Sequence, residues 1–212
     1  MFIKKCNQQF YLISKRLIDL TIALLGLIFF SPAFIVIYIL LKLKNPQAPA
    51  LFCQERIGYR GKKFTIYKFR SMVPNAEAVL QDDPALYERF VASGYKLPTD
   101  DDPRITRLGA FLRRSSLDEI PQFWNMLLGD MSLVGPRPVV HAELQEYGEH
   151  VDLFLSVRPG VLGLWQASGR SLIEYPERTE IELEYVRHAG FWYDVGIIFK
   201  NVIAIFKSKG AY

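Results

Sequence analysis

Cysteine is scarce in this chain of 212 residues, and the two that occur, Cys6 and Cys53, lie far apart in the sequence. They form no CxxC pair and no metal-ligand spacing, so the sequence indicates no zinc site. Two unpaired thiols are typical of a reducing compartment. Internal repeats and low-complexity tracts are also absent, which argues against a solenoid or a long disordered linker.

Acidic residues are sparse in the first 60 positions, where only Asp19 and Glu55 occur, although the whole chain has a net charge of only +4. The eight basic residues of that segment surround an apolar run, which favours an anionic membrane surface over nucleic acid as the partner. They are Lys4, Lys5, Lys15, Arg16, Lys42, Lys44, Arg56 and Arg60. The length is most simply that of one domain with a substantial core.

The apolar run, residues 20–41, has 22 uncharged residues and is long enough for a straight helix to cross a bilayer. Ser31 and Pro32 lie at its middle, and because proline removes a backbone hydrogen bond, we expect a break there. Two half-helices of about 12 residues would each reach about 18 Å, so a bent hairpin would enter one leaflet without crossing.

Basic residues flank both ends of this run, whereas a single crossing normally has its Lys and Arg excess on the cytoplasmic side alone. Both ends are therefore expected on the cytoplasmic side, which favours a re-entrant helix. A transmembrane helix with a proline kink is the open alternative. A cleaved signal peptide fits poorly, since the run is too long and no A-x-A site follows it.

Two short strands, residues 51–58 and 64–70, are predicted to form a β-hairpin around residues 59–62. Alternation places Lys68 and Arg70 on one face of the second strand, where a solvated sheet edge is an equally good explanation of both. Residues 75–93 are helical in character.

Three consecutive aspartates, Asp100 to Asp102, lie between prolines and could hold a divalent cation, as in the DXD motif of many nucleotide-sugar glycosyltransferases. An exposed turn is the commoner structure for such a run. Four arginines follow on the way to Asp118, and their spacing places most of them near one side of a helix. They are Arg104, Arg107, Arg113 and Arg114.

The chemical centre of the chain is the pair Asp118 and Glu119, at the start of a predicted helix that ends before Gly129. Pro121 is tolerated only in a first turn, so the helix should begin at about Asp118 or Glu119. One stripe is apolar and should be buried, with Asp118, Gln122 and Asn125 on the opposite face. The stripe consists of Ile120, Phe123, Trp124, Leu127 and Leu128.

The position of Asp118 at a helix N-terminus would favour its anion and leave N–H groups free to hold a phosphate oxygen. The alternative is an ordinary helix cap, because Ser116-Leu117-Asp118-Glu119 also fits the S-x-x-E capping box.

Two later segments carry further candidate residues. Arg137 lies between two prolines, and such a preorganised arginine suits phosphate recognition. Trp165, in the glycine-flanked segment 163–170, could pack against a ligand, although core packing is favoured. Residues 191–207 are apolar and aromatic with lysines seven apart, which indicates either an interfacial amphipathic helix or a core helix.

Five ordered motifs give the chain a resemblance to the bacterial monotopic phosphoglycosyl transferases over nearly its whole length, and that family also has a re-entrant helix broken at a Ser-Pro pair. The motifs are Tyr67-Lys68-Phe69-Arg70-Ser71-Met72, Asp102-Pro103-Arg104-Ile105-Thr106, Ser116-Leu117-Asp118-Glu119-Ile120-Pro121-Gln122, Gly129-Asp130-Met131-Ser132-Leu133-Val134-Gly135-Pro136-Arg137-Pro138 and Arg158-Pro159-Gly160. The expected fold is mainly helical α+β: a membrane hairpin over residues 1–45, and a catalytic region over 46–212 with a small β-hairpin and interfacial helices. The length is close to that of the family's bare catalytic unit.

The resemblance implies transfer of a sugar 1-phosphate from a UDP-sugar to undecaprenyl phosphate with release of UMP, at the cytoplasmic face of the bacterial inner membrane. Segment 163–170 is most similar to the galactose or glucose phosphate transferases. The family implies that Asp118 is the nucleophile, forms a covalent phosphosugar intermediate and also serves as a ligand of Mg²⁺, with Glu119 assisting. The residues carried over to substrate binding are Lys68, Arg113, Arg137, Arg170 and Asp194.

Two other functions fit parts of the sequence. A metal-dependent glycosyltransferase would use Asp100 to Asp102 and release UDP, but the alternating strands and helices of a nucleotide-binding α/β fold are not predicted here. A non-catalytic membrane scaffold in a glycan-assembly complex would show no turnover.

Overall fold

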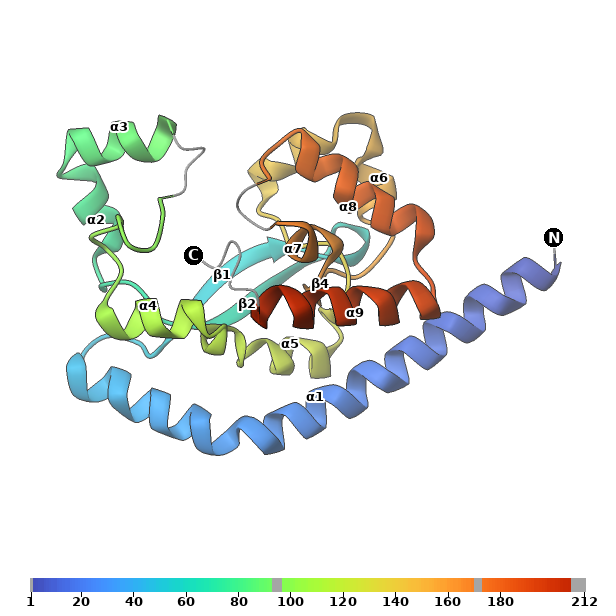
Figure 1. Ribbon diagram of the computed structural model, residues 1–212, viewed down its shortest axis with the longest axis horizontal. Helices are drawn as coiled ribbons and strands as arrows, with labels where there is room; N and C mark the ends of the chain where they lie inside the picture. The colour runs from blue at the N-terminus through green and yellow to red at the C-terminus, as the bar shows by residue number, and fades with distance from the viewer. Residues whose placement is uncertain (1, 93–96, 170–172, 207–212) are drawn as a thin grey trace.

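The computed structural model describes the backbone of residues 2–92, 97–169 and 173–206, and its architecture is mainly helical α+β, as predicted (Figure 1). Its strands form two small sheets, an antiparallel pair β1–β2 and a parallel pair β3–β4. The elements are α1 (Phe2–Lys44), β1 (Leu51–Ile57), η1 (Tyr59–Gly61), β2 (Lys63–Phe69), α2 (Ala76–Gln81), α3 (Pro84–Ala92), α4 (Arg107–Arg114), η2 (Leu117–Glu119), α5 (Gln122–Leu128), β3 (Ser132–Val134), η3 (His141–His150), α6 (Val151–Phe154), β4 (Gly160–Leu162), α7 (Leu164–Ser168), α8 (Glu177–His188) and α9 (Phe191–Phe206).

The apolar run belongs to one helix of 43 residues, α1, which bends beneath the rest of the fold (Figure 1). The interruption expected at Ser31 and Pro32 is wrong, because the helix continues through Pro32. Proline cannot donate to the carbonyl of Ile28, four residues earlier, but the Ser31 hydroxyl donates to that oxygen at 2.8 Å. The serine thus occupies the acceptor that proline leaves free. Of the described helices, α1 alone is long and apolar enough to cross a membrane.

Polar side chains on the N-terminal half of α1 bond it to the rest of the fold. Asp19, 2% exposed, accepts hydrogen bonds from the Ser132 hydroxyl at 3.0 Å and the Leu133 N–H at 2.8 Å. Arg16 donates to the carbonyls of Met126 and Leu127 at the end of α5, where free helix carbonyls favour a cation. These bonds fix α1 against α5 and β3.

The predicted hairpin is confirmed, with Phe52 opposite Lys68 and Arg56 opposite Phe64. The free edge of β2 meets Asn125, a fully buried side chain of α5. Asn125 accepts from the N–H of Tyr67 at 3.1 Å and donates to the carbonyl of Thr65 at 2.7 Å. Its amide therefore replaces a third strand, and so fixes α5 against the sheet.

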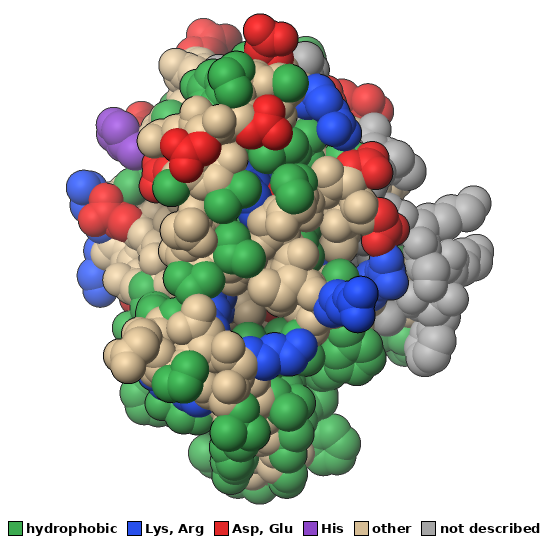
Figure 2. Space-filling model, turned by 90° about the vertical axis from the view of Figure 1, so that its left-hand side faces the viewer, with side chains coloured by type: hydrophobic (Ala, Val, Ile, Leu, Met, Phe, Trp, Pro, Cys, Tyr) green, Lys and Arg blue, Asp and Glu red, His purple; other side chains and the backbone are tan. Residues whose placement is uncertain are grey.

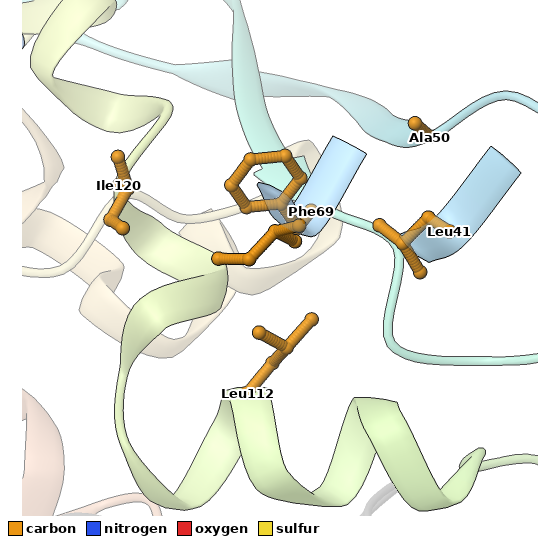
Figure 3. Close-up of a cluster of buried hydrophobic side chains, with 6 residues drawn as sticks. Leu41, Ala50, Phe69, Leu112 and Ile120 are labelled. Carbon is orange, nitrogen blue, oxygen red and sulfur yellow. The ribbon is translucent and has the colours of Figure 1, made fainter. Parts of the chain in front are cut away.

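The C-terminal half of α1 packs against the turn that carries Asp118 and Glu119. Leu41, Phe69, Leu112 and Ile120 meet in one buried cluster, and Figure 3 shows their side chains converging from α1, β2, α4 and the turn after η2. Nearer the middle of α1, Gly26 lies against the ring of Phe123, and a Cβ at this position would come within 2.8 Å of the ring.

The predicted burial of α5 is wrong in part. Gln122 and Asn125, expected on the polar face, are 3% and 0% exposed because they contact the hairpin and the Glu119 region. Trp124 and Leu128, expected in the buried stripe, are 48% and 56% exposed. Ile120 is buried as predicted.

Apolar side chains are exposed on two parts of the fold, α1 and α9. Along α1 they include Leu25, Phe29 and Ile35, and on α9 they include Trp192 and Phe199, while Ile197 of α9 is buried. One face of α9 is thus buried, as in a core helix, and the other exposes apolar side chains. In Figure 2, hydrophobic side chains gather at the lower end of the molecule and acidic ones toward the top.

Candidate active site

The turn between α4 and α5 holds the carboxylate pair. Ser116 has a left-handed backbone with φ of 56°, and Leu117–Glu119 form a single 3₁₀ turn, so the α-helix starts later than predicted, at Gln122. The predicted capping box is also wrong: Ser116 makes no side-chain cap bond, and the Glu119 carboxylate bonds to Lys68 instead.

Asp118 is 9% exposed and has no hydrogen bond to another side chain in the described part of the protein. Burial, followed by the neighbouring charge of Glu119, raises its pKa to about 6, against the opposing charges of Lys68 and Arg113. It is therefore mostly ionised at pH 7, with carboxylate oxygens that no other described side chain occupies.

Glu119 behaves oppositely. Its burial favours the neutral acid, but Lys68 and Arg137 outweigh that effect and lower the pKa to about 2. The Lys68 Nζ lies 2.7 Å from Glu119 Oε1, with both side chains partly buried. Lys68 is thus a partner of the carboxylate pair and not the edge guard that was the alternative. Adjacent carboxylates with pKa values pushed apart are typical of sites where each has its own task.

A small cavity of about 20 Å³ opens beside Glu119. Three cationic side chains line it, Lys68, Arg56 and Arg137, together with the amide of Gln166. Burial followed by the charge of Arg137 lowers the pKa of Arg56 to about 10. Three cations around one carboxylate leave an excess of positive charge, which suits an anionic ligand.

Two of the residues that line this cavity, Arg56 and Gln166, each have a buried polar atom without a hydrogen-bond partner within the described structure: Arg56 Nε and Gln166 Oε1. Sequence reasoning missed both residues. The hairpin register could have found Arg56, because it lies on the same sheet face as Lys68, with Ile66 between them in the cavity lining. No local signal singled out Gln166.

The predicted arginines separate into different surroundings. Arg113 donates from Nε to the Ser71 hydroxyl at 2.9 Å, and its charge acts on Asp118. Arg104 is buried and pairs with both oxygens of Asp102. Arg107 is exposed, as is Arg114, which pairs with Asp100. The prediction that most of these four arginines lie near one side of a helix is therefore wrong. Of the four, only Arg113 faces the carboxylate pair.

The three aspartates do not converge on a cation. Asp102 is 4% exposed and held by Arg104, Asp100 is paired with Arg114, and Asp101 is exposed. No cluster of three metal-ligating side chains occurs among the described residues.

Another predicted site residue, Asp194, lies away from the Glu119 cavity. Asp194 is 8% exposed and accepts hydrogen bonds from Tyr11, Lys15 and Tyr185, which joins α9 and α8 to α1 rather than to the Glu119 cavity. Arg170 lies outside the described residues. Trp165 is buried, 4% exposed, as the core-packing interpretation predicted.

Comparison with known proteins identifies the class. The family model described as "Bacterial sugar transferase" matches residues 10–208. The chain belongs to this family, which confirms the resemblance read from its motifs.

Three relatives illustrate the likeness. The undecaprenyl-phosphate galactose phosphotransferase of Salmonella typhimurium (strain LT2) is 42% identical over 202 residues, covering 93% of this chain and 41% of the relative. The exopolysaccharide production protein ExoY of Sinorhizobium fredii (strain NBRC 101917 / NGR234) is 42% identical over 204 residues, covering 94% and 88%. The UDP-glucose:undecaprenyl-phosphate glucose-1-phosphate transferase of Escherichia coli (strain K12) is 37% identical over 206 residues, covering 93% and 41%. The chain thus spans about two fifths of the length of several relatives that it matches.

Proposed function

We propose that this protein is a phosphoglycosyl transferase that moves a sugar 1-phosphate from a UDP-sugar to undecaprenyl phosphate and releases UMP. The names of the relatives support the acceptor and a galactose or glucose donor. The observation that carries the proposal is the carboxylate pair with separated pKa values, Asp118 at about 6 and Glu119 at about 2, beside a cation-lined cavity.

Asp118 is the nucleophile of the first step. Its carboxylate oxygen attacks the phosphorus that carries the sugar, an O–P bond forms, and the bond to the bridging oxygen breaks. UMP leaves with that oxygen and its electron pair. In the second step a phosphate oxygen of undecaprenyl phosphate attacks the same phosphorus and expels the Asp118 carboxylate.

The cations beside Glu119 hold the phosphate oxygens that do not react. Lys68 and Arg137 face the cavity, and Arg56 offers an N–H that lacks a partner in the described structure. The cavity holds about 20 Å³, so only a phosphate oxygen would enter it and the rest of the donor would lie across its opening. Glu119 keeps Lys68 in place at 2.7 Å.

Magnesium fits the free carboxylate of Asp118. Mg²⁺ takes oxygen ligands, commonly one or two carboxylates completed by substrate phosphates and water, and Asp118 has oxygens without a side-chain partner in the described structure. When bound, the ion would neutralise charge on the donor diphosphate. Asp118 would be its protein ligand.

The apolar surfaces of α1 and α9 suggest that the protein lies in the cytoplasmic face of the bacterial inner membrane. Trp124 and Leu128 of α5 are exposed close to the Asp118 turn, which would put the site at headgroup depth. A lipid-linked phosphate can meet the site only there. The bend of α1 is compatible with re-entry into a single leaflet.

The test omits the lipid acceptor. Incubation with UDP-galactose or UDP-glucose and Mg²⁺ should release one UMP per protein and leave a phosphosugar mass on Asp118. Asp118→Asn should show neither, whereas Asp101→Asn, a matched exposed aspartate, should behave as wild type. Release of UDP, with loss in the Asp101 variant, would instead support the metal-dependent glycosyltransferase. Absence of turnover with full complementation by Asp118→Asn in cells would support a scaffold.

A further inference from the structure

Arg137 is held through its backbone as well as its side chain. Its N–H donates to both carboxylate oxygens of Glu182, at 3.2 Å and 3.0 Å. Glu182 belongs to α8, 45 positions further along the chain, and is only 1% exposed. The two neighbours of Arg137 are prolines, which have no backbone N–H to donate. Among these three residues, the Arg137 N–H is therefore the one backbone donor.

The carboxylate of Glu182 also lies beside a second arginine, Arg178. Arg178, one helical turn earlier, places its Nε 3.7 Å from Glu182 Oε1 and its Nη1 3.2 Å from Glu143 Oε1. Glu143 in turn lies 3.4 Å from the Nη1 of Arg56. The buried Glu182 and the partly buried Glu143 therefore connect both cavity arginines, Arg137 and Arg56, to α8 and η3.

The indole of Trp165 adds a second constraint. The guanidinium of Arg137 lies 5.5 Å from the ring centre and that of Arg178 lies 4.6 Å from the same ring. Such cation–π contacts favour one arginine orientation over others. With the backbone fixed by Glu182 and the guanidinium placed over Trp165, Arg137 has few arrangements other than the one that lines the cavity.

We propose that Glu182 is a positioning residue, which holds Arg137 in the orientation that binds the donor diphosphate. An apolar side chain of similar size would fill the same space but would leave the Arg137 N–H without an acceptor, and the loop free to move. The inference rests on the proposed function only in assigning the diphosphate to Arg137. Glu182 itself touches no substrate.

The experiment measures UMP release by the full chain in lipid nanodiscs, with the UDP-sugar that the wild type accepts and undecaprenyl phosphate. Glu182→Met should raise the KM for the UDP-sugar about tenfold while kcat changes less than about threefold, since ground-state binding is lost. Glu182→Gln keeps one acceptor oxygen, so its KM should stay within about threefold of wild type. Glu180→Gln, an exposed glutamate of α8 paired with Arg187, is the matched control and should not change.

A double-mutant cycle separates positioning from general destabilisation. Arg137→Met should raise the donor KM, and Arg137→Met/Glu182→Met should be no worse than Arg137→Met, because Glu182 acts through the residue already removed. Additive effects, or a fall in kcat at unchanged KM, overturn the inference. If Glu182→Met does not fold, Glu182→Asp, which withdraws the carboxylate by one methylene, takes its place under the same criterion.

The two proposals fail in different ways. No UMP release by the wild type overturns the proposed function and the inference with it. UMP release with an unchanged donor KM in Glu182→Met, or in Glu182→Asp where that takes its place, overturns the inference alone.

Discussion

The raised pKa of Asp118 predicts an unusual acid dependence for the first half-reaction. The nucleophile must be ionised, and burial beside Glu119 places its pKa at about 6. The ionised fraction then falls from about 0.9 at pH 7 to about 0.1 at pH 5, so the rate of adduct formation should fall about tenfold over that range. An aspartate at the ordinary value of 3.8 would stay more than about 90% ionised at pH 5.

The assay should follow the UMP burst without lipid acceptor, at a fixed subsaturating Mg²⁺ concentration, by rapid quench between pH 5 and pH 8. This choice matters because undecaprenyl phosphate is a monoester whose second ionisation, near pH 6, would overlap that of Asp118. The diphosphate of a UDP-sugar has no ionisation in this range. The acid limb therefore reports a group of the protein.

The Glu119→Gln variant is expected to change the pKa of Asp118 and so to shift this acid limb. Removing that charge takes away a cause of the raised pKa and frees Lys68, so the acid limb should move to lower pH even though the rate itself falls. Glu55→Gln, an exposed glutamate paired with Lys63, should leave the limb in place. A wild-type burst that is flat down to pH 5, or a limb that Glu119→Gln does not move, would refute the assignment of Asp118.

Two further predictions concern the metal and the hairpin. Raising Mg²⁺ from subsaturating to saturating should also move the acid limb to lower pH, because a bound cation favours ionised Asp118; a fixed limb would mean that this residue is no ligand. Asn125→Ala should lower stability by about 2 kcal/mol, seen as a lower Tm in detergent, since it leaves the Tyr67 N–H and Thr65 carbonyl unpaired. Asn75→Ala, at an exposed position without a cap bond, should leave Tm unchanged, and equal Tm values for the two variants would contradict the role of Asn125.

The hairpin was predictable because period-two alternation and a turn segment are local features, and its register also places Arg56 on the same sheet face as Lys68. The burial pattern of α5 could not be predicted in the same way. A period of 3.6 identifies which face is apolar but not what that face contacts, and on α5 the polar Gln122 and Asn125 face the protein while Trp124 is exposed. If a bilayer lies outside, both faces meet surroundings that suit them.

Residues bound to distant partners were also beyond local reasoning. Ser116 and Glu119 satisfy a capping pattern in the sequence, but the Glu119 carboxylate accepts a hydrogen bond from Lys68, 51 positions away. Glu182 belongs to no motif, and only the fold brings it to Arg137. The carboxylate pair itself was found from the sequence, whereas the separation of its pKa values depends on burial and on two cations distant in the sequence, Lys68 and Arg137.

The bonds from Arg16 and Asp19 to α5 and β3 make α1 a rigid part of the fold and not a flexible tether. A flexible linker would let the domain rise, tip and rotate above a membrane, so that a lipid-borne phosphate would find the nucleophile at many heights. Here the helix that carries the apolar run is bonded through Arg16 and Asp19 to α5 and β3, and its C-terminal half packs against the Asp118 turn. In the proposed function, the same rigid body would therefore set the depth and tilt of the Asp118 carboxylate, and the acceptor phosphate would have to reach it at one fixed height.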